Sequence, residues 1–191
     1  MKSKARCWWC AEDPLYCDYH DKEWGIPVHD DLKIFEMLIL EGFQAGLSWI
    51  TILRKRDNFR KAFKNFDARK IAKFTKRDVE RLMKDSGIIR NRLKIEGAIA
   101  NARCFLEVQK KFGSFDKYIW GFTSNRTLRN PTGLTRKTMK ATSPESAALS
   151  KDLKQRGFKF VGPTVCQAHM QATGMVDDHV IGCFKYRKQR R

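Results

Sequence analysis

Four residues of the kinds that bind transition metals lie at opposite ends of this chain. Cys7 and His20 are near the start, whereas His179 and Cys183 are near the end. His179 and Cys183 are four residues apart and would share one face of a helix. With Cys7 and His20 they would complete a tetrahedral Cys2His2 set for a structural zinc ion, Zn²⁺. A zinc finger packs its ligands into one short module, so this spacing instead predicts a metal that joins the N-terminal and C-terminal segments of a larger domain.

The chain is also strongly basic. Its 191 residues carry a formal net charge of +18, and 42% of them are hydrophobic, which is enough for the core of one domain or of two small lobes. So large a charge indicates a polyanionic partner, with nucleic acid as the first expectation. A ribosomal or merely basic protein is the alternative, and the absence of a long apolar stretch argues against a membrane protein.

The cysteines and the start of the chain bear on location. No signal peptide is recognisable, so we expect the six cysteines to be thiols or metal ligands in a reducing compartment rather than disulfides. The expected location is cytoplasmic, reaching a bacterial nucleoid by way of DNA, or nuclear if the source is eukaryotic.

Helical patterns occur along most of the chain and strand patterns are absent, so we expect an all-α fold. Residues 30–41 have apolar positions at helical spacing behind an Asp30 N-cap. Ser48 is placed to cap the next helix. Further helices are predicted over 75–87 and 91–112, and the Asn, Pro, Gly, Arg and Lys residues of 123–142 predict a basic connecting loop.

A glycine-bounded turn between two helices is the most specific local signal. A helix is expected over 144–156, then the segment 157–162 with a glycine at each end, then a second helix from Pro163 to Gly174. Glycines let the backbone turn tightly and expose amide groups, and a helix N-terminus favours a phosphate. Residues 144–174 therefore match a helix-hairpin-helix clamp on a DNA backbone, although such turns also occur in many helical bundles.

Contiguous runs along nearly the whole chain resemble the 3-methyladenine DNA glycosylase I family of the helix-hairpin-helix DNA glycosylase superfamily. The resemblance implies a single glycosylase domain over 1–191 with that fold, which flips out and hydrolytically releases 3-methyladenine from alkylated double-stranded DNA in base excision repair. It also implies Zn²⁺ ligands at the four terminal Cys and His residues. The runs include Arg6-Cys7, Asp13-Pro14-Leu15-Tyr16, Tyr19-His20-Asp21, Glu23-Trp24-Gly25, Glu41-Gly42, residues 44–51, Gly87-Ile88-Ile89-Arg90, Lys94-Ile95, residues 156–162 and Val176-Asp177-Asp178-His179.

The family resemblance implies a base pocket lined by aromatic side chains. N3-methylation makes adenine a cationic and weakly attached leaving group, so the enzyme must chiefly hold the base and exclude normal adenine. Aromatic faces attract a cation, by up to ~2 kcal/mol when desolvated. Residues matching Tyr16, Tyr19 and Trp49 line the pocket in the family, and Trp24 offers a further face. Tyr and Trp are more often core residues, which is the alternative for Trp24 and for Trp9.

Glu41 and Asp177 are the two candidate catalytic residues. In the family, the residue matching Glu41 hydrogen-bonds the base edge. The alternative is that Glu41 is a carboxylate at a helix end that points to solvent. The residues that follow it, 42–49, favour the role in the pocket. The wider superfamily uses an Asp at the place of Asp177 to stabilise the sugar cation or activate water, but the 3-methyladenine group is not uniform there. Asp177 or Asp178 could instead be the N-cap of a short helix carrying His179. We rank Glu41 above Asp177 for base recognition.

The expected DNA contacts come from two loops. Gly46 and Leu47 match the loop that enters the gap left by the extruded nucleotide, where Leu would separate base steps; a core-facing Leu is the alternative. Pro163 stands where bifunctional relatives carry a Schiff-base lysine, so the abasic site should be left uncut. The hairpin contacts are expected from Gly157, Lys159, Phe160, Gly162 and Thr164.

Two cysteines and the C-terminal tail fit no pattern. Cys10 and Cys17 could compete with Cys7 for zinc or could be small buried residues. We expect Cys17 to be a small buried residue and leave both possibilities open for Cys10. No four-cysteine run for an iron–sulfur cluster is present. The basic tail 185–191 is expected to be disordered without DNA.

Two other classes of function are weighed against the glycosylase. A catalytically silent reader of damaged DNA would need a defective pocket, yet the expected pocket residues are all present. A structural or RNA-associated basic protein is disfavoured by the hairpin and by the 176–179 run. We expect no obligate protein partner and a monomer.

Overall fold

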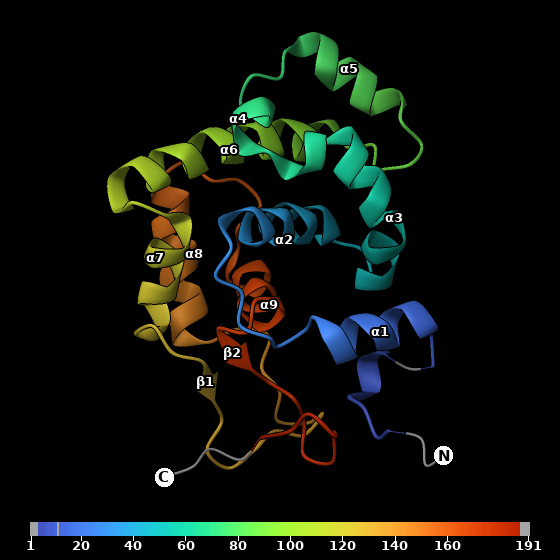
Figure 1. Cartoon of the computed structure of the whole chain (residues 1–191), viewed down its shortest axis with the longest axis vertical. Helices are drawn as coiled ribbons and strands as arrows, with labels where there is room; N and C mark the ends of the chain where they lie inside the picture. Colours follow the sequence, from blue (N-terminus) through green and yellow to red (C-terminus); the bar gives the residue numbers. More distant parts are fainter. Residues whose placement is uncertain (1–3, 11, 188–191) are drawn as a thin grey trace.

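A computed structural model describes residues 4–10 and 12–187 and is mainly helical (Figure 1). Two two-residue strands, β1 and β2, and three single 3-10 turns complete the regular structure. The elements are η1 Trp8–Cys10, α1 Pro14–Lys22, α2 Asp31–Gln44, α3 Trp49–Ala62, η2 Lys64–Phe66, α4 Ala68–Ile71, α5 Lys76–Lys84, α6 Arg92–Phe112, α7 Phe115–Trp120, η3 Gly121–Thr123, β1 Leu128–Arg129, α8 Pro144–Gln155, α9 Pro163–Ala172 and β2 Val176–Asp177.

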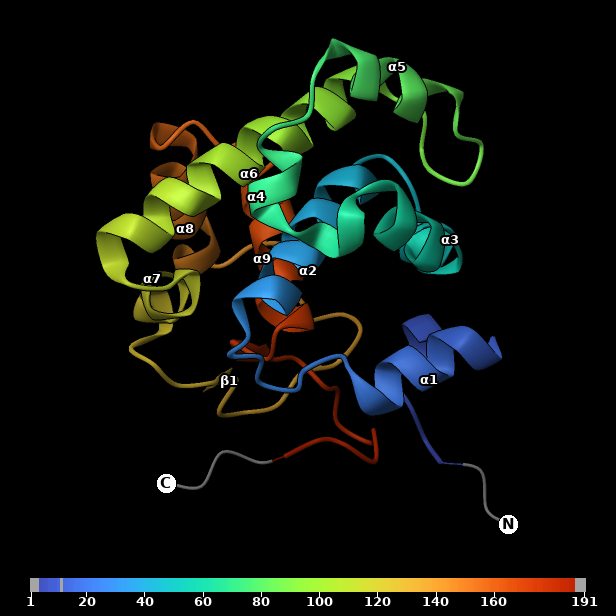
Figure 2. The same ribbon diagram turned by 45° about the horizontal axis from the view of Figure 1, so that its top comes forward.

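Helix α2 is the centre of the fold. Its residues 34–43 are all buried, and it packs against α3, α6, α7 and α9; Figures 1 and 2 both place α9 beside it. A helix that is buried all round belongs to a core. Any charged group on it must therefore be paired, and this applies to Glu36 and Glu41, which are 7% and 2% exposed.

The predicted helix ends are mostly confirmed. The Asp30 side chain accepts from the Lys33 N–H, and the Asn91 side chain accepts from the Lys94 N–H. Gly113 ends α6 with φ +86°, a conformation that favours glycine. Ser48 precedes α3 but its side chain makes no cap bond. The capping box of α5, the proline starts of α8 and α9 and the basic loop over 123–142 are as expected.

The segment after α9 corrects two expectations. Val176 and Asp177 form a short parallel pair with Leu128 and Arg129, although no strand was predicted. His179 lies in an irregular segment and Cys183 in the turns that follow it, rather than on one helix. Gly182 takes φ +93°, and the Cys183 N–H donates to the Val180 carbonyl at 3.0 Å. The predicted helix face, and the helix N-cap at Asp177 or Asp178, are therefore wrong.

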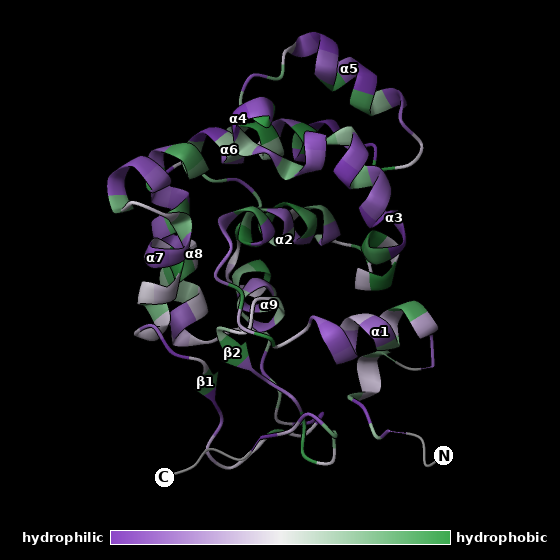
Figure 3. Cartoon of the chain, in the orientation of Figure 1, coloured by the Kyte–Doolittle hydropathy of each residue, from purple (hydrophilic) through white to green (hydrophobic). Residues whose placement is uncertain are grey.

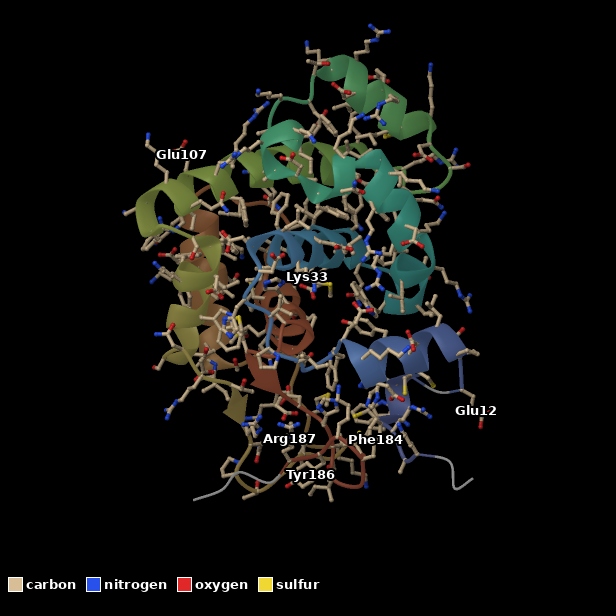
Figure 4. The ribbon with its side chains drawn as sticks, in the orientation of Figure 1. Glu12, Lys33, Glu107, Phe184, Tyr186 and Arg187 are labelled. Carbon is tan, nitrogen blue, oxygen red and sulfur yellow. The ribbon has the colours of Figure 1, made fainter. Side chains whose placement is uncertain are left out.

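Part of the basic tail is ordered, contrary to expectation. The Lys185 ammonium donates to the carbonyl oxygens of His20, Asp21 and Trp24 at 3.2, 3.3 and 3.1 Å, which neutralises the C-terminal end of α1. Tyr186 and Arg187 continue at the lower end of the molecule in Figure 4. Residues 188–191 lie outside the described residues.

The outer surface is largely hydrophilic. Figure 3 shows α5 at the outer end in mostly purple tones, while α2 carries green segments in the interior. Within residues 4–10 and 12–187, no helix is both long and apolar enough to cross a membrane.

Candidate active site and metal centre

An aromatic cavity of about 150 Å³ opens between α1, α2, α3 and α9. Every side chain expected in the base pocket lines it: Tyr16 and Tyr19 from α1, Trp24 after α1, Glu41 from α2 and Trp49 from the start of α3. Sequence reasoning missed the other lining residues, which are Trp9, Gln44, Met139, Ala168, Gln171 and Ala172.

The aromatic rings of the cavity pack against one another. The ring centroid of Trp9 is 4.9 Å from that of Tyr16 and 4.9 Å from that of Trp24, and the rings of Tyr19 and Trp49 are 5.4 Å apart. Trp24 is therefore both a core residue and a pocket wall, and the half-buried Trp9 packs against the core while lining the pocket. Tilted and edge-on packing of this kind holds each ring in place.

Two features of these rings bear on polar recognition. Burial raises the pKa of Tyr16 to about 12 and that of Tyr19 well above its usual value, so both phenols stay neutral hydrogen-bond donors. The Trp49 Nε1–H is buried without an acceptor among the described residues. Because buried donors are nearly always satisfied, it is available to a ligand.

Glu41 brings the only carboxylate among the lining side chains. Its Oε2 lies 3.0 Å from Nδ1 of the fully buried His169 on α9. Burial raises the pKa of Glu41, and the neighbouring His169 opposes that shift. His169 was not anticipated, because a lone histidine on an apolar helix face gives no signal in the sequence.

Three of the four metal-type residues of the two chain ends meet beside this pocket. Ligand atoms of Cys7, His20 and Cys183 all lie within 4.8 Å of one another. The Nδ1 of His20 is 2.9 Å from a carboxylate oxygen of Asp21, so Nε2 faces the thiols, 3.4 Å from the Cys183 sulfur.

His179 lies beside the three clustered residues. Its ring centroid is 5.2 Å from that of His20, and its Nε2 is buried without a partner in the described part of the chain. Its Nδ1 is 2.7 Å from Asp177 Oδ1. Metal-binding histidines typically hold a carboxylate on the second nitrogen. Cys7, His20 and Cys183 form a cluster that could hold a metal ion, and His179, which is not one of the three, has a ring nitrogen nearby that could be a fourth ligand.

Cys10 and Cys17 are not in this cluster. Cys10 is fully buried and its thiol donates to the Cys7 carbonyl at 3.1 Å, while burial raises its pKa to about 11. Cys17 is half-buried. Cys10 is thus a protonated thiol that supports the Cys7 turn.

Asp177 does not line the aromatic cavity. One of its oxygens contacts His179 and the other accepts from Arg129 Nε at 3.0 Å. Although burial opposes the charge, the hydrogen bonds from His179 and Arg129 hold the pKa of Asp177 below its usual value. Its contacts are those of a residue that orients His179.

The loop after α2 exposes Leu47, the residue expected to separate base steps. Leu47 is 41% exposed, and Gly46 precedes it with φ +80°. The ammonium of Lys94 on α6 donates to the carbonyls of Phe43 and Ala45 at 2.9 and 2.6 Å. This buried lysine holds the end of α2 from which the loop departs.

Helix α6, which carries Lys94, also anchors the turn between α8 and α9. Asn101 accepts from the Lys159 N–H at 2.7 Å and donates to the Lys159 carbonyl at 3.0 Å. Phe160 has φ +56° and packs against Gly97, where a Cβ would lie only 2.9 Å from its ring. Gly157 turns the chain with φ +94°, and Lys159 and Thr164 are exposed while Gly162 is half-buried.

Comparison with known proteins gives a consistent result. A family model for methyladenine glycosylase matches residues 9–186. The DNA-3-methyladenine glycosylase 1 of Escherichia coli strain K12 is 50% identical over 181 residues, covering 95% of this chain and 96% of that protein. A crystal structure of a 3-methyladenine DNA glycosylase I superposes with a TM-score of 0.92 at 48% identity, covering 95% of this chain and 100% of that one. A structure concerned with 3-methyladenine recognition by the Staphylococcus aureus enzyme has a TM-score of 0.92 at 34% identity, covering 97% of this chain and 98% of that one.

Proposed function

Because the chain belongs to the methyladenine glycosylase family, we propose that the aromatic cavity is where it excises 3-methyladenine from alkylated DNA. The protein is a DNA glycosylase of base excision repair, and it hydrolyses the bond between the damaged base and its sugar. The observation that carries the assignment of the site is Glu41, a carboxylate only 2% exposed in a cavity walled by aromatic rings.

The chemistry of the substrate explains this combination of groups. A 3-methylated adenine is cationic, so it is attracted to the faces of Trp and Tyr rings and to the Glu41 carboxylate. Normal adenine is neutral and gains neither attraction in full. The base leaves readily once held outside the helix, so selection by binding supplies most of the catalysis. Glu41 then acts by accepting hydrogen from the base edge, with His169 fixing the orientation of its carboxylate.

The proposed DNA contacts are the two loops anchored on α6. Leu47 would fill the gap left by the flipped nucleotide, separating base steps at a cost of a few kcal/mol. The turn between α8 and α9 would hold a backbone phosphate through exposed amides and Lys159. Phe160 packs one ring edge on Gly97 but is still 36% exposed, so both its backbone and its ring could contact DNA. Pro163 in place of a Schiff-base lysine makes the enzyme monofunctional and leaves the abasic site intact.

We further propose that the metal centre holds one structural zinc ion. Cys7, His20, His179 and Cys183 would be its ligands, and zinc would supply a rigid tetrahedral cross-link between the chain ends. Trp24 packs 4.6 Å from the His179 ring, so the cross-link would also support the pocket wall. We propose that residues 1–191 act as one domain and as a monomer.

The test is chromatography of free bases released from methylated duplex DNA at low and moderate salt. Wild type should release 3-methyladenine, leave 7-methylguanine and leave the strand uncut. Glu41→Gln should reduce release about 10- to 100-fold while DNA binding is retained, because a hydrogen bond to a charged group contributes ~1.5–3 kcal/mol.

Glu36→Gln is the matched control. Glu36 is a buried carboxylate of the same helix that accepts from Arg60 at 2.8 Å and does not line the aromatic cavity. Its release of 3-methyladenine should stay close to that of wild type. Tight DNA binding by wild type without any base release would overturn the proposal in favour of a catalytically silent damage reader.

A further inference from the structure

Two adjacent acids after α9 have separate tasks. Successive side chains of an extended segment point to opposite sides. Asp177 turns toward His179 and Arg129, whereas Asp178 turns toward α9. Asp178 is 7% exposed, and its Oδ2 accepts from the amide nitrogens of Gln171 at 2.6 Å and Gln167 at 3.4 Å.

The pairing with Asp178 determines which end of the Gln171 amide remains for other partners. The Gln171 Nε2 donates to Asp178 Oδ2, so the NH₂ end of this amide is held by Asp178. The carbonyl oxygen Oε1 is thereby turned away from Asp178. Gln171 lines the aromatic cavity together with Glu41. Oε1 is therefore the end of this amide that Asp178 does not engage, and on a side chain that lines the cavity it can serve as an acceptor in addition to Glu41.

We propose that Gln171, oriented by Asp178, is a specificity-determining residue that accepts a hydrogen bond from the exocyclic amino group of the bound purine. The proposal rests on the function assigned to this pocket and deepens it. A 6-amino group has two protons and can serve both Glu41 and Gln171. A 6-oxo group has none, so 3-methylguanine would set its oxygen against that of Gln171 and leave both unsatisfied. Gln171 thus selects 6-aminopurines over 6-oxopurines.

The measured quantity is the ratio of kcat/KM for 3-methyladenine release to that for 3-methylguanine release from methylated duplex DNA. Gln171→Leu removes the acceptor and shortens the side chain by one atom, and should lower this ratio about tenfold, the effect of one hydrogen bond. The fall should come from slower release of 3-methyladenine with release of 3-methylguanine unchanged or faster. Asp178→Asn, which lets the Gln171 amide turn over, should lower the ratio in the same direction at unchanged metal content.

Gln109→Leu is the matched control for lost stability. Gln109 on α6 donates to an Asp31 oxygen at 2.6 Å, an equivalent glutamine–aspartate bond that lies away from the cavity. This variant should leave the ratio at the wild-type value. If Gln171→Leu releases neither base, selectivity is measured instead as the ratio of the affinities of the folded variant for free 3-methyladenine and free 3-methylguanine, from tryptophan fluorescence. This ratio of affinities should fall in the same direction.

The two proposals fail separately. Wild type that releases no 3-methyladenine would defeat the assigned function. Wild type that releases it, combined with unchanged selectivity in Gln171→Leu, would overturn the role of Gln171. A loss of both bases in equal proportion in Gln171→Leu and Asp178→Asn would also overturn that role, because it is the result of a merely structural residue.

Discussion

Replacing Lys94 by Met should separate DNA distortion from base binding. The Lys94 side chain is 9% exposed, and its ammonium donates to the Phe43 and Ala45 carbonyls at the end of α2. Met keeps the apolar stem and removes both donors together with the charge at the helix C-terminus. Burial lowers the pKa of Lys94, so part of the gain from its hydrogen bonds is already offset in the wild type.

The expected loss of stability follows from the two carbonyls. The Phe43 carbonyl is in a buried bond, and leaving it unsatisfied costs about 1–3 kcal/mol. The Ala45 carbonyl is nearer to solvent and can regain water, so its loss should be about 0.5–1 kcal/mol. The sum is roughly 1.5–4 kcal/mol, which for a chain of this size lowers Tm by about 3–16 °C.

The functional consequence is tested below the Tm of the variant. Lys94→Met should release 3-methyladenine from duplex DNA more slowly, as Leu47→Ala should, because the proposed wedge loop is no longer held. Affinity for free 3-methyladenine should change less than twofold, since neither residue lines the cavity. Lys110→Met, an exposed lysine on the same helix, controls for the lost charge. Normal duplex activity in folded Lys94→Met, or an equal loss of free-base affinity, would refute the reasoning.

Two further predictions concern ionisation and metal. Release of 3-methyladenine should fall as pH drops through the raised pKa of Glu41, and this acid limb of the kcat/KM profile should be absent in Glu41→Gln. The folded state binds this proton more tightly than the unfolded chain does. The contribution of Glu41 to stability is therefore greatest below its pKa in the unfolded chain, and it is lost as pH rises through its pKa in the folded protein. The free energy of unfolding should thus vary less with pH in Glu41→Gln than in wild type. Atomic spectroscopy of protein purified without chelator should give about one zinc per chain, and His179→Ala should lower both this ratio and Tm; a wild-type ratio well below one would rule out the zinc site.

Local signals predicted the helices well because each end is marked by a residue with a physical reason to be there. Asp30 and Asn91 accept from first-turn amides, and Gly113 supplies a positive φ. The segment from His179 to Cys183 was predicted wrongly. Its four-residue spacing suits a helix, but pairing with the loop at Leu128 and the turn at Gly182 override it.

The pocket was foreseen only where contiguous motifs carry it. Tyr16, Tyr19 and Glu41 stand in runs that resemble a known family. His169 and Gln171 come from a helix with no such mark at those positions, and their tasks arise from contacts with Glu41, 128 residues away, and with Asp178. Contacts of this kind depend on how elements pack, which hydrophobic periodicity does not encode.

Helix α6 has a consequence for how the enzyme searches DNA. Lys94 and Asn101 are seven residues apart on one helix, so the anchors of the proposed wedge loop and of the proposed phosphate-binding turn are separated by a fixed rise of about 10 Å. Under the proposed contacts, the protein cannot lengthen or shorten this spacing to suit a straight duplex. The duplex must supply the deformation, and its stiffness then differs from one base step to another. Lesions beside easily kinked pyrimidine–purine steps would be engaged sooner than identical lesions within stiff A-tracts, so the local mechanics of the genome would set the order of repair.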